Sequence, residues 1–174
     1  MLGQRIVFFI ISFLAFGLSA SGFANSEKTV TMNATVFMFD TLSQSISASG
    51  NVAVYFGDTR LTGNVGDYRQ DTQTVKLQGD VKLNRNDVNL SCKTMTAFLK
   101  KDAVLADGGV NITYLDYSGH SQRVYFDGMK KLVILTGSPL LLHDEDQITA
   151  EQITIDIDQK KIRTKGKTKI KVKK

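Results

Sequence analysis

The sequence has few residues that cross-link a small domain or interrupt its strands. It has one cysteine, Cys92, one proline and no tryptophan. A single cysteine excludes an internal disulfide, so the stability of the fold must come from burial and from backbone hydrogen bonds. The sequence is instead rich in Val, Ile, Thr, Tyr and Phe, which suit a pleated surface. The composition therefore predicts a β-rich fold.

Residues for catalysis and metal binding are also scarce. The only histidines are His120 and His143. His143 begins the acidic stretch 143–146, which has the residue types of a cation site, but a surface turn is the commoner explanation of such a run. Cys92 lies in a strand-like stretch, where it is expected to behave as a small apolar residue. We therefore expect a binding protein rather than an enzyme, with no cofactor and no metal.

The amino-terminal residues have the pattern of an export signal. Arg5 carries one positive charge, residues 6–18 are mostly apolar, and Gly22-Phe23-Ala24 offers small residues for cleavage. These features predict a cleaved secretory signal over residues 1–24 and one mature domain over residues 25–174. The alternative is an uncleaved anchor, because residues 6–24 are 19 in number and long enough to span a bilayer. An exported protein is not expected to bind nucleic acid.

Glycines that recur every 29 residues indicate an internal repeat. Apolar residues stand two and four positions after most of these glycines, and four positions before them. Within each copy, apolar and polar residues alternate as in half-buried strands. We expect about three strands per copy, a kink or bulge at each glycine, and no helix longer than a turn. The glycines are Gly50, Gly79, Gly108, Gly137 and Gly166.

Two architectures fit this repeat, a parallel β-solenoid and a stack of antiparallel hairpins rolled into a jelly roll. The short, regular connections and the single polar face of each strand favour the antiparallel form. The expected fold is thus an all-β antiparallel jelly roll built from 29-residue repeats and open at both ends, with unpaired strand edges there. The solenoid remains the second possibility.

The carboxyl-terminal segment is strongly basic. Nine of the 15 residues from Lys160 to Lys174 are Lys or Arg, and they alternate with Ile, Thr, Gly and Val. We therefore expect a strand with one basic face. Its lysines either protect an edge from unwanted pairing or offer a surface to an anionic partner, such as a phosphorylated lipid or an acidic protein patch. The expected assembly edge consists of Lys167, Lys169, Ile170, Lys171 and Val172.

Several stretches resemble the LptA/OstA-like family of periplasmic lipopolysaccharide-transport proteins. They are ATVFMFD at 34–40 with SASGNV at 47–52, GHSQRVYFD at 119–127 with LTG at 135–137, and ITAEQITI at 148–155. The stretches occur in order over nearly the whole mature chain. The resemblance implies an antiparallel jelly roll whose interior groove shields the acyl chains of lipopolysaccharide.

The resemblance also implies partners and site residues. It predicts a periplasmic bridge that joins head to tail with copies of itself, with an inner-membrane anchored jelly-roll protein and with an outer-membrane translocon. Its cargo would be the lipid A moiety of lipopolysaccharide. An anchored partner of the same pathway and a β-repeat scaffold without lipid are the alternatives. The residues expected to contact lipid are Val30, Met32, Phe37, Phe39, Ile112, Tyr114, Phe126 and Leu135.

Overall fold

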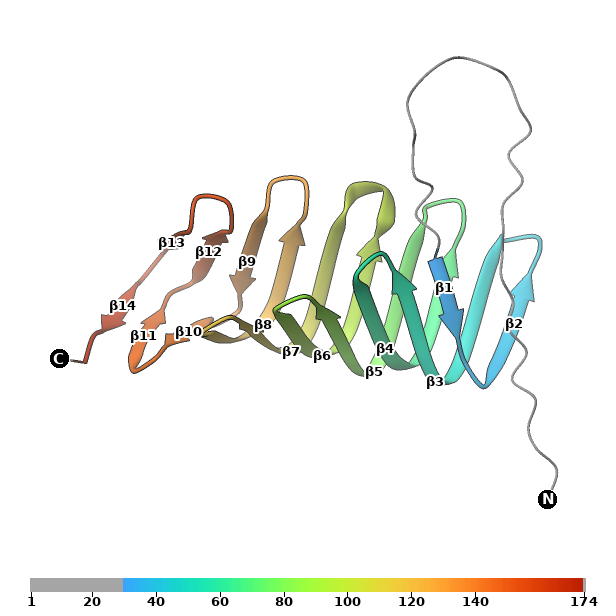
Figure 1. Ribbon diagram of the computed structural model, residues 1–174, viewed down its shortest axis with the longest axis horizontal. Coiled ribbons are helices and arrows are strands. Elements are labelled where there is room, and N and C mark those ends of the chain that lie inside the picture. The colour runs from blue at the N-terminus through green and yellow to red at the C-terminus, as the bar shows by residue number, and fades with distance from the viewer. Residues whose placement is uncertain (1–29, 174) are drawn as a thin grey trace, which may run out of the picture.

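The computed structural model describes residues 30–173, and the predicted signal segment lies outside them. The described chain forms one 14-stranded sheet. Its strands follow one another along the long axis of the molecule, from β1 and β2 at one end to β14 at the other (Figure 1). The strands and the single 3₁₀ turn are β1 (Val30–Asn33), β2 (Val36–Asp40), β3 (Ser45–Phe56), β4 (Thr59–Arg69), β5 (Thr74–Arg85), β6 (Val88–Phe98), η1 (Leu99–Lys101), β7 (Ala103–Tyr114), β8 (Tyr117–Asp127), β9 (Leu132–Thr136), β10 (Leu140–His143), β11 (Asp146–Thr149), β12 (Gln152–Asp156), β13 (Lys161–Lys165) and β14 (Lys169–Lys171).

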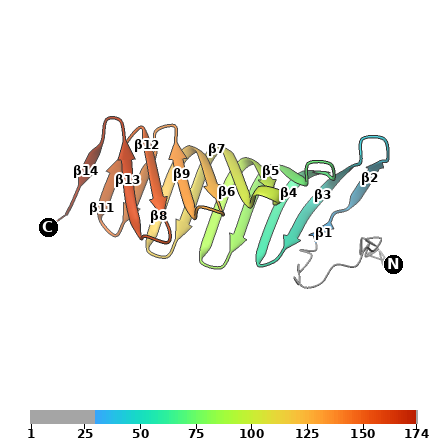
Figure 2. The ribbon, with the colours of Figure 1, turned by 90° about the horizontal axis from the view of Figure 1, so that it is seen from above.

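Neighbouring strands pair antiparallel throughout, as Figure 2 shows from above. This confirms the antiparallel form and excludes the parallel solenoid. The expectation of about three strands per copy is wrong for the central repeats, which consist of two strands of 11 or 12 residues each. The strands are longer because pairing resumes beyond each bulge. In β5, for example, Gln78 pairs with Thr94 and Val81 pairs with Cys92.

The repeat glycines bend the strands and fold the sheet into two layers. All five have φ between +77° and +89°, a region that glycine enters without a steric penalty. In β3, β5 and β7 the bulge lies within one strand. In the fourth copy the chain separates after Gly137 into β9 and β10, and Pro139, which has no backbone N–H to donate, directly precedes β10.

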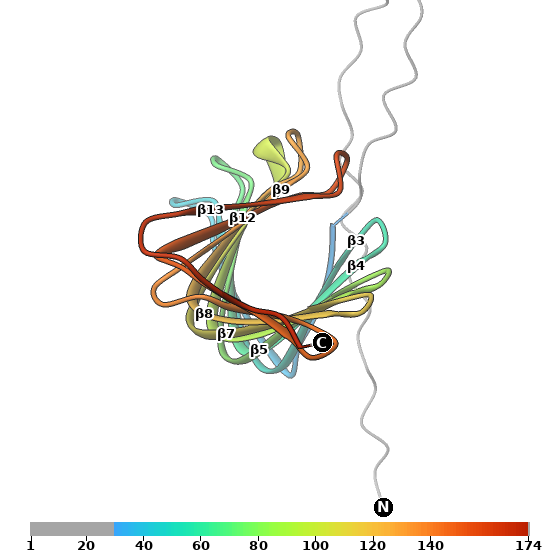
Figure 3. The same ribbon diagram turned by 90° about the vertical axis from the view of Figure 1, so that its left-hand side faces the viewer.

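The two layers are distinguished by their turns. The short-turn layer contains β1, β10, β11, β14 and the halves of β3–β8 that are joined by two-residue turns. The long-turn layer contains β2, β9, β12, β13 and the other halves, joined by four-residue turns. Viewed along the long axis, the strands wrap around that axis as an open C (Figure 3). We call the bulged edge where the layers meet the crease, and the opposite, turn-bearing edge the mouth.

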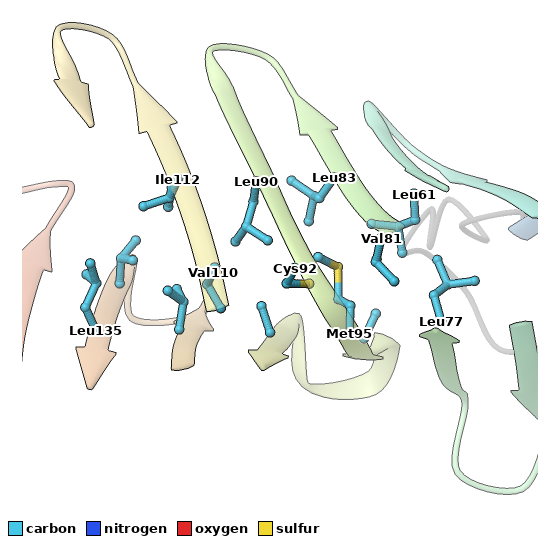
Figure 4. Close-up of a cluster of buried hydrophobic side chains, with 14 of the residues drawn as sticks. Leu61, Leu77, Val81, Leu83, Leu90, Cys92, Met95, Val110, Ile112 and Leu135 are labelled. Atoms are coloured by element: carbon cyan, nitrogen blue, oxygen red, sulfur yellow. The ribbon is translucent and has the colours of Figure 1, made fainter. Parts of the chain in front are cut away.

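The hydrophobic core lies between the layers. Because side chains alternate across a strand, every second residue points inward, and the inward rows of adjacent strands stack along the axis. Figure 4 shows Leu83, Leu90 and Ile112 in this way, with Met95 and Leu135 nearer the crease. These five side chains are all buried. Burial decreases towards both ends of the roll, where Ile170, for example, is 60% exposed.

The basic carboxyl-terminal segment forms two strands rather than the single strand expected, because Gly166 interrupts it as the other repeat glycines bend theirs. The alternation holds, with Lys161, Arg163 and Lys165 exposed and Ile162 half-buried against the core. Among residues 30–173, no helix is long and apolar enough to cross a membrane.

Candidate functional site

A cavity of about 90 Å³ lies between the layers and opens towards the mouth. Its walls come from both layers and include residues of every strand from β3 to β9 and of β12. Leu83 and Ile112 belong to the short-turn layer, while Val104, Phe126 and Ile155 belong to the long-turn layer. These residues point inward because each occupies an alternate position of its strand. The cavity therefore has the surface that hydrocarbon prefers.

An ion pair spans the mouth of this cavity. The Nη1 atom of Arg85, the last residue of β5, lies 4.0 Å from Oδ1 of Asp102, the last residue of a long turn. Arg85 and Asp102 are the only charged residues among those that line the cavity. About a third of each side chain is exposed, 37% for Arg85 and 34% for Asp102. The pair thus connects the two layers at the boundary between apolar interior and water.

Along the long-turn rim of the mouth, backbone hydrogen bonds connect each long turn to the one before it. In each copy the N–H of the first turn residue donates to the C=O of the last residue of the preceding turn. Gly128 N, for example, lies 2.7 Å from Asp102 O, and Leu99 N lies 3.0 Å from Gln73 O. A Cβ at residue 128 would collide with Asp102, so the sequence needs glycine there. This packing fixes the backbone that carries Asp102.

The two rims differ in charge. The second residue of every short turn is acidic, while each of the last three long turns carries two lysines at or beside it. One lysine reaches back along its rim, since Lys100 Nζ donates to Asp71 O at 3.2 Å. The acidic set is Asp58, Asp87, Asp116 and Glu145, and the basic set is Lys100, Lys101, Lys130, Lys131, Lys160 and Lys161.

Three of the residues predicted to contact lipid line the cavity, namely Ile112, Tyr114 and Phe126. Leu135 does not line it, because it is fully buried towards the crease and packs beside Gly119. The sequence pattern marks Leu135 as inward-facing but does not tell how far an inward residue lies from the mouth. Its role as a lipid contact remains a prediction that this position does not favour.

The other four predicted lipid contacts lie at the amino-terminal end of the roll. Val30 and Met32 in β1 are half-buried and pack against the core. Phe37 and Phe39 in β2 face the same side, with ring centroids 6.1 Å apart. Phe39 is 55% exposed, because no further strand covers β2. These residues continue the inward rows to an open end instead of lining the central cavity.

Sequence reasoning missed Arg85 and Asp102. The signal for Arg85 was present, since it continues the alternation of Val81 and Leu83 and occupies the repeat position of Phe56 and Tyr114. Nothing comparable marked Asp102, because its turn conformation and its distance from Arg85 depend on how the layers close.

Cys92 and the histidine of the acidic stretch 143–146 are both engaged in packing or hydrogen bonding within the fold. The Cys92 thiol is buried and donates a hydrogen bond to Thr94 O at 3.1 Å. Burial raises the pKa of this thiol to about 11. His143 stacks on Tyr117, with ring centroids 4.4 Å apart. Within residues 30–173, no three His, Cys, Asp or Glu side chains are grouped as metal ligands would be.

The predicted assembly edge lies at the carboxyl-terminal end of the sheet. Lys169, Ile170 and Lys171 form β14, which pairs with β11 on one side only. Lys167 precedes this strand, and Val172 follows it with 64% exposure. At the opposite end, β1 and β2 likewise pair only with β3. Both ends therefore offer backbone groups for further pairing.

Taken together, the fold and the groove define an open antiparallel jelly roll with an apolar interior that is accessible along one edge. Residues 62–161, more than half of the chain, match the family described as LptA/(LptD N-terminal domain) LPS transport protein. The chain belongs to this family, which confirms the resemblance seen in its sequence.

The fold is similar to the crystal structure of LptH, the LptA-homologous periplasmic component of the lipopolysaccharide transport device from Pseudomonas aeruginosa, with 14% identity and a TM-score of 0.39. The match covers 87% of this chain and 99% of the LptH chain. No curated protein sequence matches significantly.

Proposed function

We propose that the protein is a periplasmic bridge that carries lipopolysaccharide from the inner to the outer membrane with its acyl chains shielded between the layers. The observation that carries this proposal is the cavity, whose lining is apolar apart from a few polar groups at its mouth. Each methylene that moves from water into such a lining contributes roughly 0.8 kcal/mol. Membership of a lipopolysaccharide-transport family supports the same cargo.

The layers must part for acyl chains to enter, since a volume of about 90 Å³ is small for a lipid. The strand pairing favours such a motion because its hydrogen bonds run within each layer. Across the mouth, the layers are connected through side chains such as Arg85 and Asp102. Opening at the mouth with the crease as hinge therefore leaves the sheet ladders intact.

The open ends support the bridge part of the proposal. An unpaired edge can add a strand from another molecule, whose main-chain hydrogen bonds then supply affinity. The edge formed by β1 and β2 and the edge formed by β13 and β14 would pair head to tail with further copies, with an inner-membrane anchored jelly roll and with the outer-membrane translocon. Delivery to the periplasm would follow cleavage of residues 1–24, which leaves Asn25 as the first residue.

Site-specific photocrosslinking in cells tests the proposal. A benzophenone amino acid at position 126 faces the groove, and the same amino acid at position 125 faces outward because side chains alternate. We expect a lipopolysaccharide adduct from position 126 and none from position 125. Mass spectrometry of the purified protein reports its amino terminus in the same experiment. An adduct at neither position supports the scaffold, and an intact terminus in the inner-membrane fraction supports the anchored partner.

A further inference from the structure

We propose that Arg85 binds a phosphate group of the lipid A moiety at the mouth of the groove. When the groove is empty, the same arginine forms an ion pair with Asp102. This inference rests on the proposed function, since it names how the cargo's headgroup is held. It adds to the apolar groove a single polar site that fixes where the headgroup of the amphipathic ligand lies.

The pair is specific to one copy of the repeat. The positions equivalent to Arg85 are occupied by Phe56, Tyr114 and His143, and those equivalent to Asp102 by Gln73 and Lys131, among others. A structural requirement of the fold would be expected in every copy. A charged pair in only one copy, at the mouth of the apolar cavity, instead indicates a role in what that cavity receives.

The geometry suits an exchange of partners. The Arg85–Asp102 pair is 4.0 Å long and about one third exposed, and such pairs contribute little to stability because water screens them. A phosphate monoester offers the guanidinium two parallel, charge-assisted hydrogen bonds. An entering lipid A molecule can therefore displace Asp102 without leaving Arg85 unpaired, and Asp102 can be solvated on the rim.

The surrounding charges direct the phosphate to this point. The short-turn rim presents acidic turn residues, of which Asp87 is two positions from Arg85, so it repels an anion outside the groove. The facing long turn carries Lys100 and Lys101, both exposed, directly before Asp102. When the acyl chains lie in the cavity, the phosphate of the headgroup at the mouth thus lies between Arg85 on one side and a lysine-bearing turn on the other.

The test compares two lipids of identical acyl chains, bisphosphorylated lipid A and its dephosphorylated form, in binding to the full mature protein. We expect Arg85→Ala to weaken binding of the phosphorylated lipid about tenfold, as loss of a charge-assisted hydrogen bond does, and to leave the dephosphorylated lipid nearly unaffected. Asp102→Asn should strengthen binding of the phosphorylated lipid, because Arg85 is then free. Asparagine is chosen since it tolerates the positive φ of +45° at this position.

Arg60→Ala is the matched control, because Arg60 is an exposed arginine of β4 that stacks on Tyr55 outside the groove. It should change neither affinity. If Arg85→Ala and Asp102→Asn shift the affinity in the same direction and equally for both lipids, the pair is only a clasp between the layers and the inference is wrong. The same holds if the parent protein binds both lipids equally, although the proposed function then stands. Failure of the parent to bind either lipid overturns the proposed function itself.

Discussion

The backbone of Gly108 lies directly against the side chain of Lys93 on the neighbouring strand. A Cβ at residue 108 would stand 2.8 Å from the Cβ of Lys93, and neither atom could move without the backbone. The same relationship recurs along the crease, for example between Gly137 and Gln122. The repeat glycine is therefore required by a side chain that covers it as well as by its positive φ.

The first prediction follows from this contact. Gly108→Asn should destabilise the protein by about 1–3 kcal/mol, the cost of forcing extra atoms into a packed site. Gly109→Asn is the matched control, because Gly109 also has a positive φ, of +75°, but a Cβ there meets nothing within 4 Å. In the first copy, Asn51 occupies the position equivalent to Gly109 and has a positive φ, which shows that asparagine is compatible with this backbone conformation. Urea unfolding of both variants measures the difference, and equal losses would show that φ alone selects glycine.

Much of this fold was predictable because the repeat and the alternation are local signals. The column of glycines located the bulges of β3, β5 and β7, and the alternation of Val52 and Val54 predicted which side chains point inward. The number of strands was not predictable, since a bulge at Gly79 and a turn look alike in sequence. Whether pairing resumes after the glycine depends on the strand alongside, which the sequence pattern does not describe.

The site was predictable only in part for a similar reason. Alternation assigns Leu135 and Phe126 equally to the interior, yet only Phe126 lines the cavity. Their difference lies in the distance from the crease, which depends on how the two layers close. The pairing of Arg85 with Asp102 depends on the same closure, since it joins the end of β5 in the short-turn layer to a long turn of the opposite layer.

The second prediction concerns Cys92, whose thiol has its pKa raised by burial from 9.0 to about 11. Because each pKa unit changes the thiolate fraction tenfold, the folded protein at pH 8 should react with a disulfide reagent about one hundred times more slowly than the unfolded protein. The raised pKa also predicts a pH effect on stability. The contribution of the protonated thiol is complete below pH 9 and is lost as the pH rises through 11.

Cys92→Ser provides the control for this prediction. Ser121 occupies the equivalent position in the next copy and donates to Arg123 O at 3.0 Å, as Cys92 donates to Thr94 O. The serine variant should therefore fold and should lose less stability between pH 9 and 11 than the parent. Parallel melting curves for the two proteins over this range would contradict the assigned burial effect.

The third prediction concerns the carboxyl-terminal edge. Deleting residues 166–174 removes β14, which pairs only with β11 over three residue pairs. Most of the sheet should remain, whereas head-to-tail assembly should be lost together with the edge that supports it. Light scattering across a range of protein concentrations measures assembly. A full-length protein that stays monomeric at high concentration would argue against pairing at this edge.

Charge and backbone pairing can be separated at the same edge. Replacing Lys169 and Lys171 by Gln leaves the strand in place and removes two exposed charges. If backbone pairing supplies the affinity, this variant should assemble as the parent does.

Neutralising Lys167 together with these two lysines should weaken lipopolysaccharide binding at most slightly, and only at low salt, because exposed charges are screened.

The last prediction tests the groove wall by placing a charge on it. Phe126→Asp should abolish lipopolysaccharide binding, because a carboxylate facing acyl chains must lose its hydration without gaining a partner. Met32→Asp should do the same at the open amino-terminal end, where Met32 packs half-buried against the core. Tyr125→Asp and Thr31→Asp are the controls, since each places the charge on the opposite face of the same strand. Circular dichroism verifies that all four variants are folded before they are crosslinked to lipopolysaccharide. If both groove variants are folded and still bind as the parent does, the acyl chains do not lie between the layers.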